Sequence, residues 1–211
     1  MSSATFMAFA LVALIGVLTP GLDTMLILRH SLLGGRRAGV ATAFGISLGC
    51  LIWGTASIAG LTALLTASQL AYDIVRIAGA AYLLWLGGSA LWKSLPRNQV
   101  AQPEELPTAS AGLTSWAALR SGMTTNLLNP KVGVFYISLL PQFLPAGPAA
   151  FTWGLLLVAT HISIGLLWLT ALVWIAGRAR ALFQRRRVRA WLDRITATVL
   201  VGLGLKMAVQ G

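Results

Sequence analysis

Two short segments inside long apolar runs carry the polar residues best suited to chemistry, namely Thr19-Pro20-Gly21-Leu22-Asp23 and Asn126-Leu127-Leu128-Asn129-Pro130-Lys131. Because proline has no backbone N–H, each proline breaks a helix and frees a carbonyl, that of Gly16 or that of Asn126. Each break also starts a half-helix with a partially positive end. A freed carbonyl and a helix start together suit the ammonium and carboxylate of a zwitterion. The alternative is two simple kinks, filled by neighbouring Ser, Thr or water.

Asp23 is the acidic residue that lies deep within an apolar run. A charge at membrane depth is costly and by default indicates a functional site. A carboxylate in a low-dielectric environment suits a proton carrier. The alternative interpretation is a structural carboxylate paired with Arg29 on the same run.

Lys131 follows the second proline directly, and the role of its ammonium has two interpretations. It is a counter-ion to Asp23 or to a substrate carboxylate, or it extends to the membrane interface. Asn126 and Asn129 are polar groups in an apolar helix and need partners. His161, in the middle of another apolar run, is either a hydrogen-bonded packing residue or a proton relay.

These residues define the predicted substrate and proton site. It comprises Thr19, Pro20, Gly21, Asp23, Asn126, Asn129, Pro130 and Lys131, with His161 as the candidate relay.

The composition predicts an all-α polytopic membrane protein. Hydrophobic residues make up 57% of the 211 positions and charged residues 10%, against about 25% charged in soluble domains. Apolar runs of bilayer-spanning length predict six transmembrane helices, at about 4–28, 38–65, 74–92, 115–144, 149–176 and 194–210. Barrel strands would instead be short and alternating in polarity.

The basic residues are concentrated between the apolar runs, which explains the net charge of +11 without nucleic acid as a partner. The first, third and fifth connections are basic, whereas the second and fourth are poor in Lys and Arg. The positive-inside rule therefore puts the odd connections in the cytoplasm and both termini outside. The strongly basic fifth connection, 178–194, is expected to bind anionic lipid.

The polar segment 94–112, with Pro96, Pro103 and Pro107, is predicted to be a flexible cytoplasmic linker. It separates a first three-helix repeat, 1–93, from a second, 113–211. Pro20 matches Pro130, which predicts two inverted repeats whose helices 1 and 4 are broken at proline. Inverted repeats with broken helices are typical of secondary transporters. The alternative is that two prolines match by chance.

Several other features indicate structure and not catalysis. Gly45 and Gly49 form a small-xxx-small pair, which indicates a helix-packing face. The single cysteine, Cys50, cannot form an internal disulfide and is expected to behave as a small apolar residue. With one cysteine and two distant histidines, His30 and His161, the sequence predicts no metal site, cofactor or enzyme activity.

The segment Thr19 to Thr24 with Gly34-Gly35-Arg36-Arg37-Ala38-Gly39 resembles the LysE/RhtB family of amino-acid exporters, as does Gly79-Ala80-Ala81-Tyr82-Leu83. The strongest match is Asn126 to Lys131 followed by Leu140-Pro141-Gln142-Phe143. The resemblance implies an inner-membrane efflux protein driven by the proton-motive force. The chain departs from the family at Leu22. Family members usually have proline at this position, which gives the sequence Pro-Gly-Pro.

We therefore expect a secondary transporter that exports an amino acid or close derivative across the bacterial inner membrane. We do not expect it to bind nucleic acid. Proton antiport is the expected mechanism, and the expected partners are the amino acid, protons and membrane lipid. The alternatives are an uncoupled channel or facilitator and a non-transporting membrane sensor or interaction protein. The sequence names no substrate and leaves open whether the chain forms a homo-oligomer.

Overall fold

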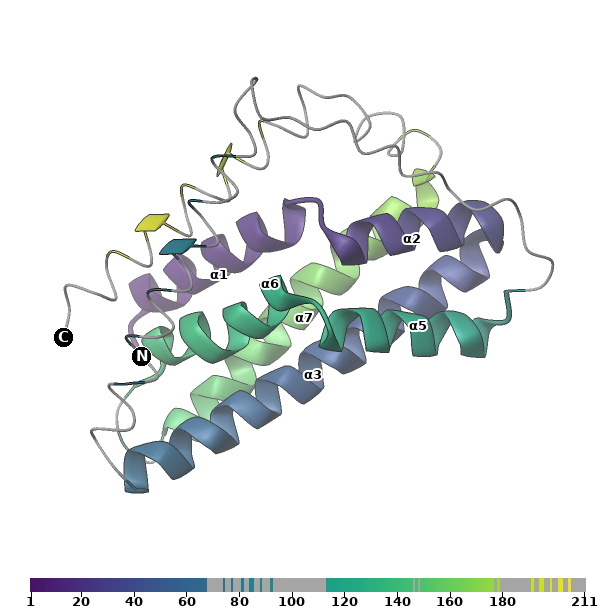
Figure 1. Cartoon of the computed structure of the whole chain (residues 1–211). Helices are drawn as coiled ribbons and strands as arrows, with labels where there is room; N and C mark the ends of the chain where they lie inside the picture. Colours follow the sequence, from purple (N-terminus) through teal and green to yellow (C-terminus); the bar gives the residue numbers. More distant parts are fainter. Residues whose placement is uncertain are drawn as a thin grey trace.

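The computed structural model describes residues 1–67, 113–145 and 149–176, together with isolated positions between and beyond these ranges. Within this described part the chain is helical and has no strand, which confirms the all-α class (Figure 1). The predicted runs 74–92 and 194–210, the linker 94–112 and the basic connection 178–194 fall largely outside the described residues.

The first apolar run is two helices, α1 (Ser3–Leu18) and α2 (Leu22–Leu33), bent by 51° with respect to each other. The Ser2 hydroxyl oxygen caps α1 by accepting the Thr5 N–H at 3.1 Å. The interval between the two helices contains Pro20, which has no N–H to continue α1. The run extends past the expected end at residue 28, since α2 continues to Leu33.

The connection between α2 and α3 (Gly35–Ala67) is a tight turn and not the loop that the basic residues suggested. Gly34 ends α2, and Gly35 follows with a φ of 72°, a conformation that glycine adopts without strain. Arg29 consequently lies within α2, whereas Arg36 and Arg37 belong to the first turn of α3.

The predicted run 115–144 consists of four short elements. These are α5 (Ser115–Leu127), α6 (Pro130–Val134), the π-helical turn η2 (Phe135–Leu139) and the 3₁₀ turn η3 (Leu140–Phe143). The chain runs through α5 and α6 in the direction opposite to its course through α1 and α2 (Figure 1).

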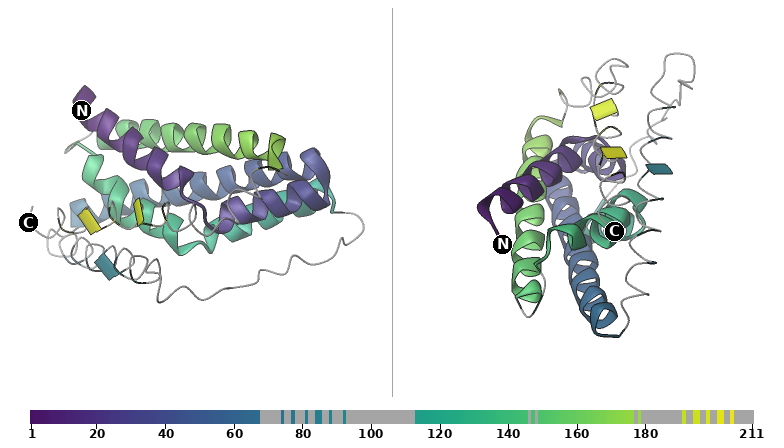
Figure 2. Two further views of the ribbon diagram at one scale, coloured as in Figure 1. Left: turned by 90° about the horizontal axis from the view of Figure 1, so that it is seen from above. Right: turned by 90° about the vertical axis from the view of Figure 1, so that its left-hand side faces the viewer.

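Two helices of the described part are long and apolar enough to cross a bilayer, and the bent pair α1–α2 would make a third span. The two are α3, over Gly35–Gly60, and α7 (Ala150–Trp174). Both helices lie beside the interrupted segments α1–α2 and α5–α6 in all three views (Figures 1 and 2). The described part therefore has the long apolar helices that are typical of a membrane protein.

Small residues let α3 and α5 approach backbone to backbone. A Cβ added at Gly45 would collide with the Leu119 carbonyl oxygen, and one added at Gly122 would collide with the Thr42 carbonyl oxygen. A Cβ at Gly49 would lie 2.6 Å from the Asn126 side-chain oxygen. The predicted packing face of Gly45 and Gly49 is thus confirmed, and it seats Asn126 directly against α3.

Gly45→Ala should destabilise the protein, because the new methyl group meets a backbone atom that cannot rotate away. Overpacking of this kind costs about 1–3 kcal/mol. We expect a lower thermal unfolding temperature in detergent. Gly60→Ala is the matched control, since a Cβ there meets nothing within 4 Å, and alanine favours helix by about 1 kcal/mol. Equal unfolding temperatures for the two variants would contradict the close approach of α3 and α5.

Candidate functional site

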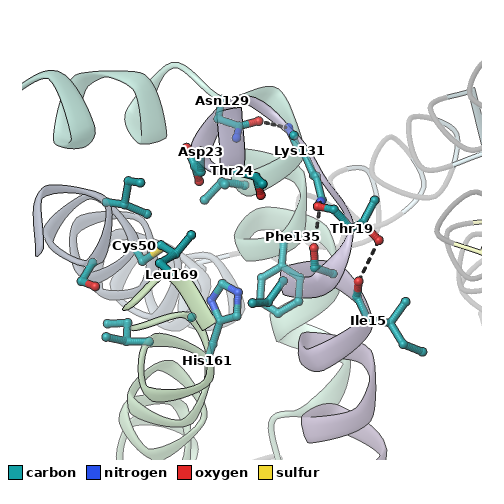
Figure 3. A pocket seen from close by; sticks show the side chains of 18 of the residues that line it. Ile15, Thr19, Asp23, Thr24, Cys50, Asn129, Lys131, Phe135, His161 and Leu169 are labelled. Atoms are coloured by element: carbon teal, nitrogen blue, oxygen red, sulfur yellow. Dashed lines mark hydrogen bonds between the residues drawn. The ribbon is translucent and has the colours of Figure 1, made fainter. Parts of the chain in front are cut away.

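A cavity of about 100 Å³ lies beside the interval between α1 and α2. One water needs about 10–15 Å³ by the same measure, so the cavity has room for a small solute. Its walls come from α1, α2, α3, α6, η2 and α7, and are mostly aliphatic (Figure 3). Its polar side chains are those of Thr19, Asp23, Thr24, Ser47, Asn129, Lys131 and His161.

The Lys131 ammonium joins the two broken segments. Its Nζ donates to the Gly16 carbonyl oxygen at 2.7 Å and to the Thr19 carbonyl oxygen at 3.0 Å (Figure 3). The Gly16 carbonyl is the one to which Pro20, which has no N–H, cannot donate a hydrogen bond. The expectation that this carbonyl stands free for a substrate is therefore wrong, because a cation from the same chain already occupies it.

At the second break, between α5 and α6, the backbone groups find hydrogen-bond partners within the break itself. The Asn126 carbonyl accepts the Asn129 N–H at 3.1 Å, and the Asn129 side-chain oxygen accepts the Lys131 N–H at 3.1 Å. The predicted free carbonyl at Asn126 is thus also wrong, since a tight turn supplies a nearer donor than the residue four positions on. Asn129 acts as the N-cap of α6, directly before Pro130.

Asp23 lies in the first turn of α2, where the helix dipole favours a negative charge. Its Oδ2 accepts a hydrogen bond from Asn126 Nδ2 at 2.9 Å, whereas its Oδ1 is buried and has no hydrogen-bond partner among the described residues. Asn129 and Lys131 lie close enough to act on its charge. No ion pair with Arg29 exists in the described structure, so the proposed structural pairing of Asp23 with Arg29 is not observed.

His161 reaches the cavity from α7 with one nitrogen already engaged. Its Nδ1 and the Tyr136 hydroxyl are 2.6 Å apart, and its ring stacks on Phe135 with 4.3 Å between centroids. It is thus both a hydrogen-bonded packing residue and a cavity-lining one, which leaves both sequence interpretations in place. On α5, Asn126 Nδ2 lies 3.5 Å from the sulfur of the buried Cys50.

The predicted site residues fall into two groups. Thr19, Gly21, Asp23, Asn129, Lys131 and His161 line the cavity. Asn126 bonds to Asp23 from behind, and Pro20 and Pro130 stand at the two interruptions without lining the cavity.

Sequence reasoning missed the cavity-lining residues Phe135, Gly165 and Leu169. All three residues are themselves apolar and lie in largely apolar runs, so no local signal separates a cavity wall from a packing face. Within the described residues, no three His, Cys, Asp or Glu side chains are grouped so as to hold a metal ion.

A family model described as LysE type translocator matches residues 14–211. The chain belongs to the LysE type translocator family. The resemblance inferred from the paired motifs is therefore confirmed. LysE type translocators are transporters, so this membrane protein is a transporter and not an enzyme.

Similar proteins align with this LysE type translocator along nearly the whole chain. The leucine efflux protein of Enterobacter sp. (strain 638) is 27% identical over 205 residues, 96% of this chain and 94% of that protein. The threonine efflux protein of Escherichia coli (strain K12) is 23% identical over 208 residues, covering 97% and 98%. The uncharacterized membrane protein YrhP of Bacillus subtilis (strain 168) is 28% identical over 208 residues, covering 98% and 99%. No solved structure matches the chain.

Proposed function

We propose that this LysE type translocator exports an amino acid, or a close derivative, across the bacterial inner membrane in exchange for protons. The relatives named leucine and threonine efflux proteins support amino-acid export. The observation that carries the site is Asp23, a cavity-lining carboxylate whose buried Oδ1 has no donor among the described residues. A buried acceptor of this kind is costly unless a ligand supplies the hydrogen.

The substrate ammonium binds at Asp23. An ammonium carries several N–H donors and a positive charge, and both complement the unpartnered oxygen of a carboxylate. The substrate carboxylate lies toward Lys131, whose charge is held at the cavity wall by the Gly16 and Thr19 carbonyls. Thr19, Gly21 and Asn129 complete this polar end, while Asn126, Pro20 and Pro130 support it from outside the cavity.

Coupling follows from competition at the same carboxylate. Asp23 holds either a proton or the substrate ammonium, because each neutralises the one negative charge of the cavity. A carrier that releases the substrate on one side and takes up a proton there returns with the proton bound. The inward proton gradient then drives export of the substrate. His161, at the cavity wall, is positioned to relay protons through its hydrogen bond to Tyr136.

The complete fold in this proposal has six spans in two inverted three-helix repeats, 1–93 and 113–211, joined by the linker 94–112. Two observations support it. The bent pairs α1–α2 and α5–α6 run in opposite directions, as the first helices of inverted repeats must (Figure 1). Lys131, just after the second interruption, bonds to carbonyls at the first. Both interruptions then lie near the membrane centre, where transporters of this kind bind substrate.

The odd connections face the cytoplasm, and both termini lie outside. The Arg36 guanidinium lies 4.2 Å from the centroid of the Trp174 ring. Since Arg36 starts α3 and Trp174 ends α7, this contact supports placing the first and fifth connections on one side. The fifth connection, 178–194, then faces anionic lipid on the cytoplasmic side.

Topology is testable with reporter fusions. Fusions after Gly35, Asn98 and Gln184 should all report a cytoplasmic position, because each falls in a connection rich in basic residues. The measurement is paired alkaline phosphatase and fluorescent-protein activity in whole cells. A periplasmic position at Asn98 would contradict the two inverted repeats.

Asp23→Asn should abolish proton-driven export while leaving the protein in the membrane. The amide keeps the shape of the carboxylate and the neighbourhood of Asn126, but it cannot exchange a proton. The measurement is flux of labelled amino acid in vesicles, with and without a pH gradient, at equal protein content. Export by the variant at the wild-type rate under a pH gradient would instead show that Asp23 is structural. Wild-type export that does not depend on the pH gradient would indicate an uncoupled facilitator.

A further inference from the structure

The charged side chains of the cavity lie at one end, and the rest of the lining, here called the apolar end, is mostly aliphatic but includes His161 (Figure 3). Figure 3 shows Asp23, Asn129 and Lys131 gathered together, with His161 well separated from them. From α7, the residues His161, Ile162, Gly165 and Leu169 line the cavity. These positions recur at helical spacing, so they form one face of α7 turned to the cavity. An amino acid bound by its charged groups at the polar end must direct its side chain toward this face.

The charges of the lining restrict that side chain. Among the residues that line the cavity, Asp23 is the acidic one and Lys131 is the one with an ammonium. The ammonium and carboxylate of the substrate backbone balance this pair. A lysine or arginine side chain would enter the apolar end, where the described lining offers no second carboxylate, and an acidic side chain would meet no second ammonium among the described lining residues. A charge left there without a partner is strongly unfavourable.

Gly165 leaves the apolar end open. A Cβ built at this position meets no atom within 4 Å, although the residue lies in the middle of α7. Elsewhere on the same helix, a Cβ at Gly154 would press on Ile58 at 2.8 Å, so that glycine serves helix packing. Since Gly165 is not required by close packing, its missing side chain adds space to the cavity.

We propose that the substrate is an amino acid with an uncharged aliphatic side chain, and that Gly165 sets the size of side chain the transporter accepts. The side chain rests on the α7 face between Ile162 and Leu169, in the space that any larger residue at 165 would fill. This inference rests on the proposed amino-acid export and adds its substrate class and a specificity-determining residue.

The test compares binding of leucine, alanine and lysine to the purified full chain in detergent, for the wild type, Gly165→Ala and Gly165→Leu. The wild type should bind leucine more tightly than alanine and should bind lysine least. One methylene in an apolar pocket is worth about 10–200-fold. Gly165→Leu should therefore weaken leucine binding at least about 10-fold relative to alanine, and Gly165→Ala should give an intermediate ratio.

Gly60→Leu is the matched control, because it is also a helical glycine whose Cβ meets nothing, but it does not line the cavity. It should keep the wild-type ratio of leucine to alanine. Retained alanine binding shows that each variant is folded. An unchanged leucine-to-alanine ratio in both Gly165 variants, or lysine binding as tight as leucine binding, would overturn this inference alone. Failure of the wild type to bind any amino acid would overturn the proposed function as well.

Discussion

An ammonium group bonded to two backbone carbonyls is the interaction on which the described structure depends. Pro20 has no N–H, so it cannot donate the helical hydrogen bond to the Gly16 carbonyl. Lys131 supplies the missing donor from a segment more than half the chain away and also bonds to Thr19. The Lys131 side chain thereby provides a hydrogen-bond donor for the carbonyls at the end of α1. It also joins the end of α1 to the start of α6.

This arrangement fixes the positions of the two charges of the site. Lys131 is held at the end of α1, while Asp23 is held at the start of α2 by its bond to Asn126. Asn126 can reach Asp23 because the glycines of α3 and α5 allow their backbones to meet. The positions of the two charges at the cavity wall therefore depend on two constraints, the interruption at Pro20 and the glycine contact between α3 and α5. The polar end of the proposed substrate site is the outcome of both.

The parts that sequence reasoning predicted are those with a local signal. Apolar runs indicated a helical membrane protein, and the paired motifs indicated the LysE family. Asp23 and Lys131 attracted attention because a charge in an apolar run is costly wherever it points. The partners were not predictable, since the contact of Lys131 with Gly16 and the turn at Asn129 depend on tertiary geometry. Gly165 gave no signal, because a glycine in an apolar helix looks the same at a packing face and at a cavity.

The most direct test of this account is a double-mutant cycle on unfolding in detergent, with Pro20→Ala, Lys131→Met and the double variant. Alanine at position 20 restores an N–H for the Gly16 carbonyl, so Lys131 has less to stabilise. We predict that Lys131→Met lowers stability by about 1–3 kcal/mol in the wild type, the usual cost of orphaned buried groups. The same change should cost clearly less beside Pro20→Ala. Equal losses in both backgrounds would contradict the claim that Lys131 replaces the donor missing at Pro20.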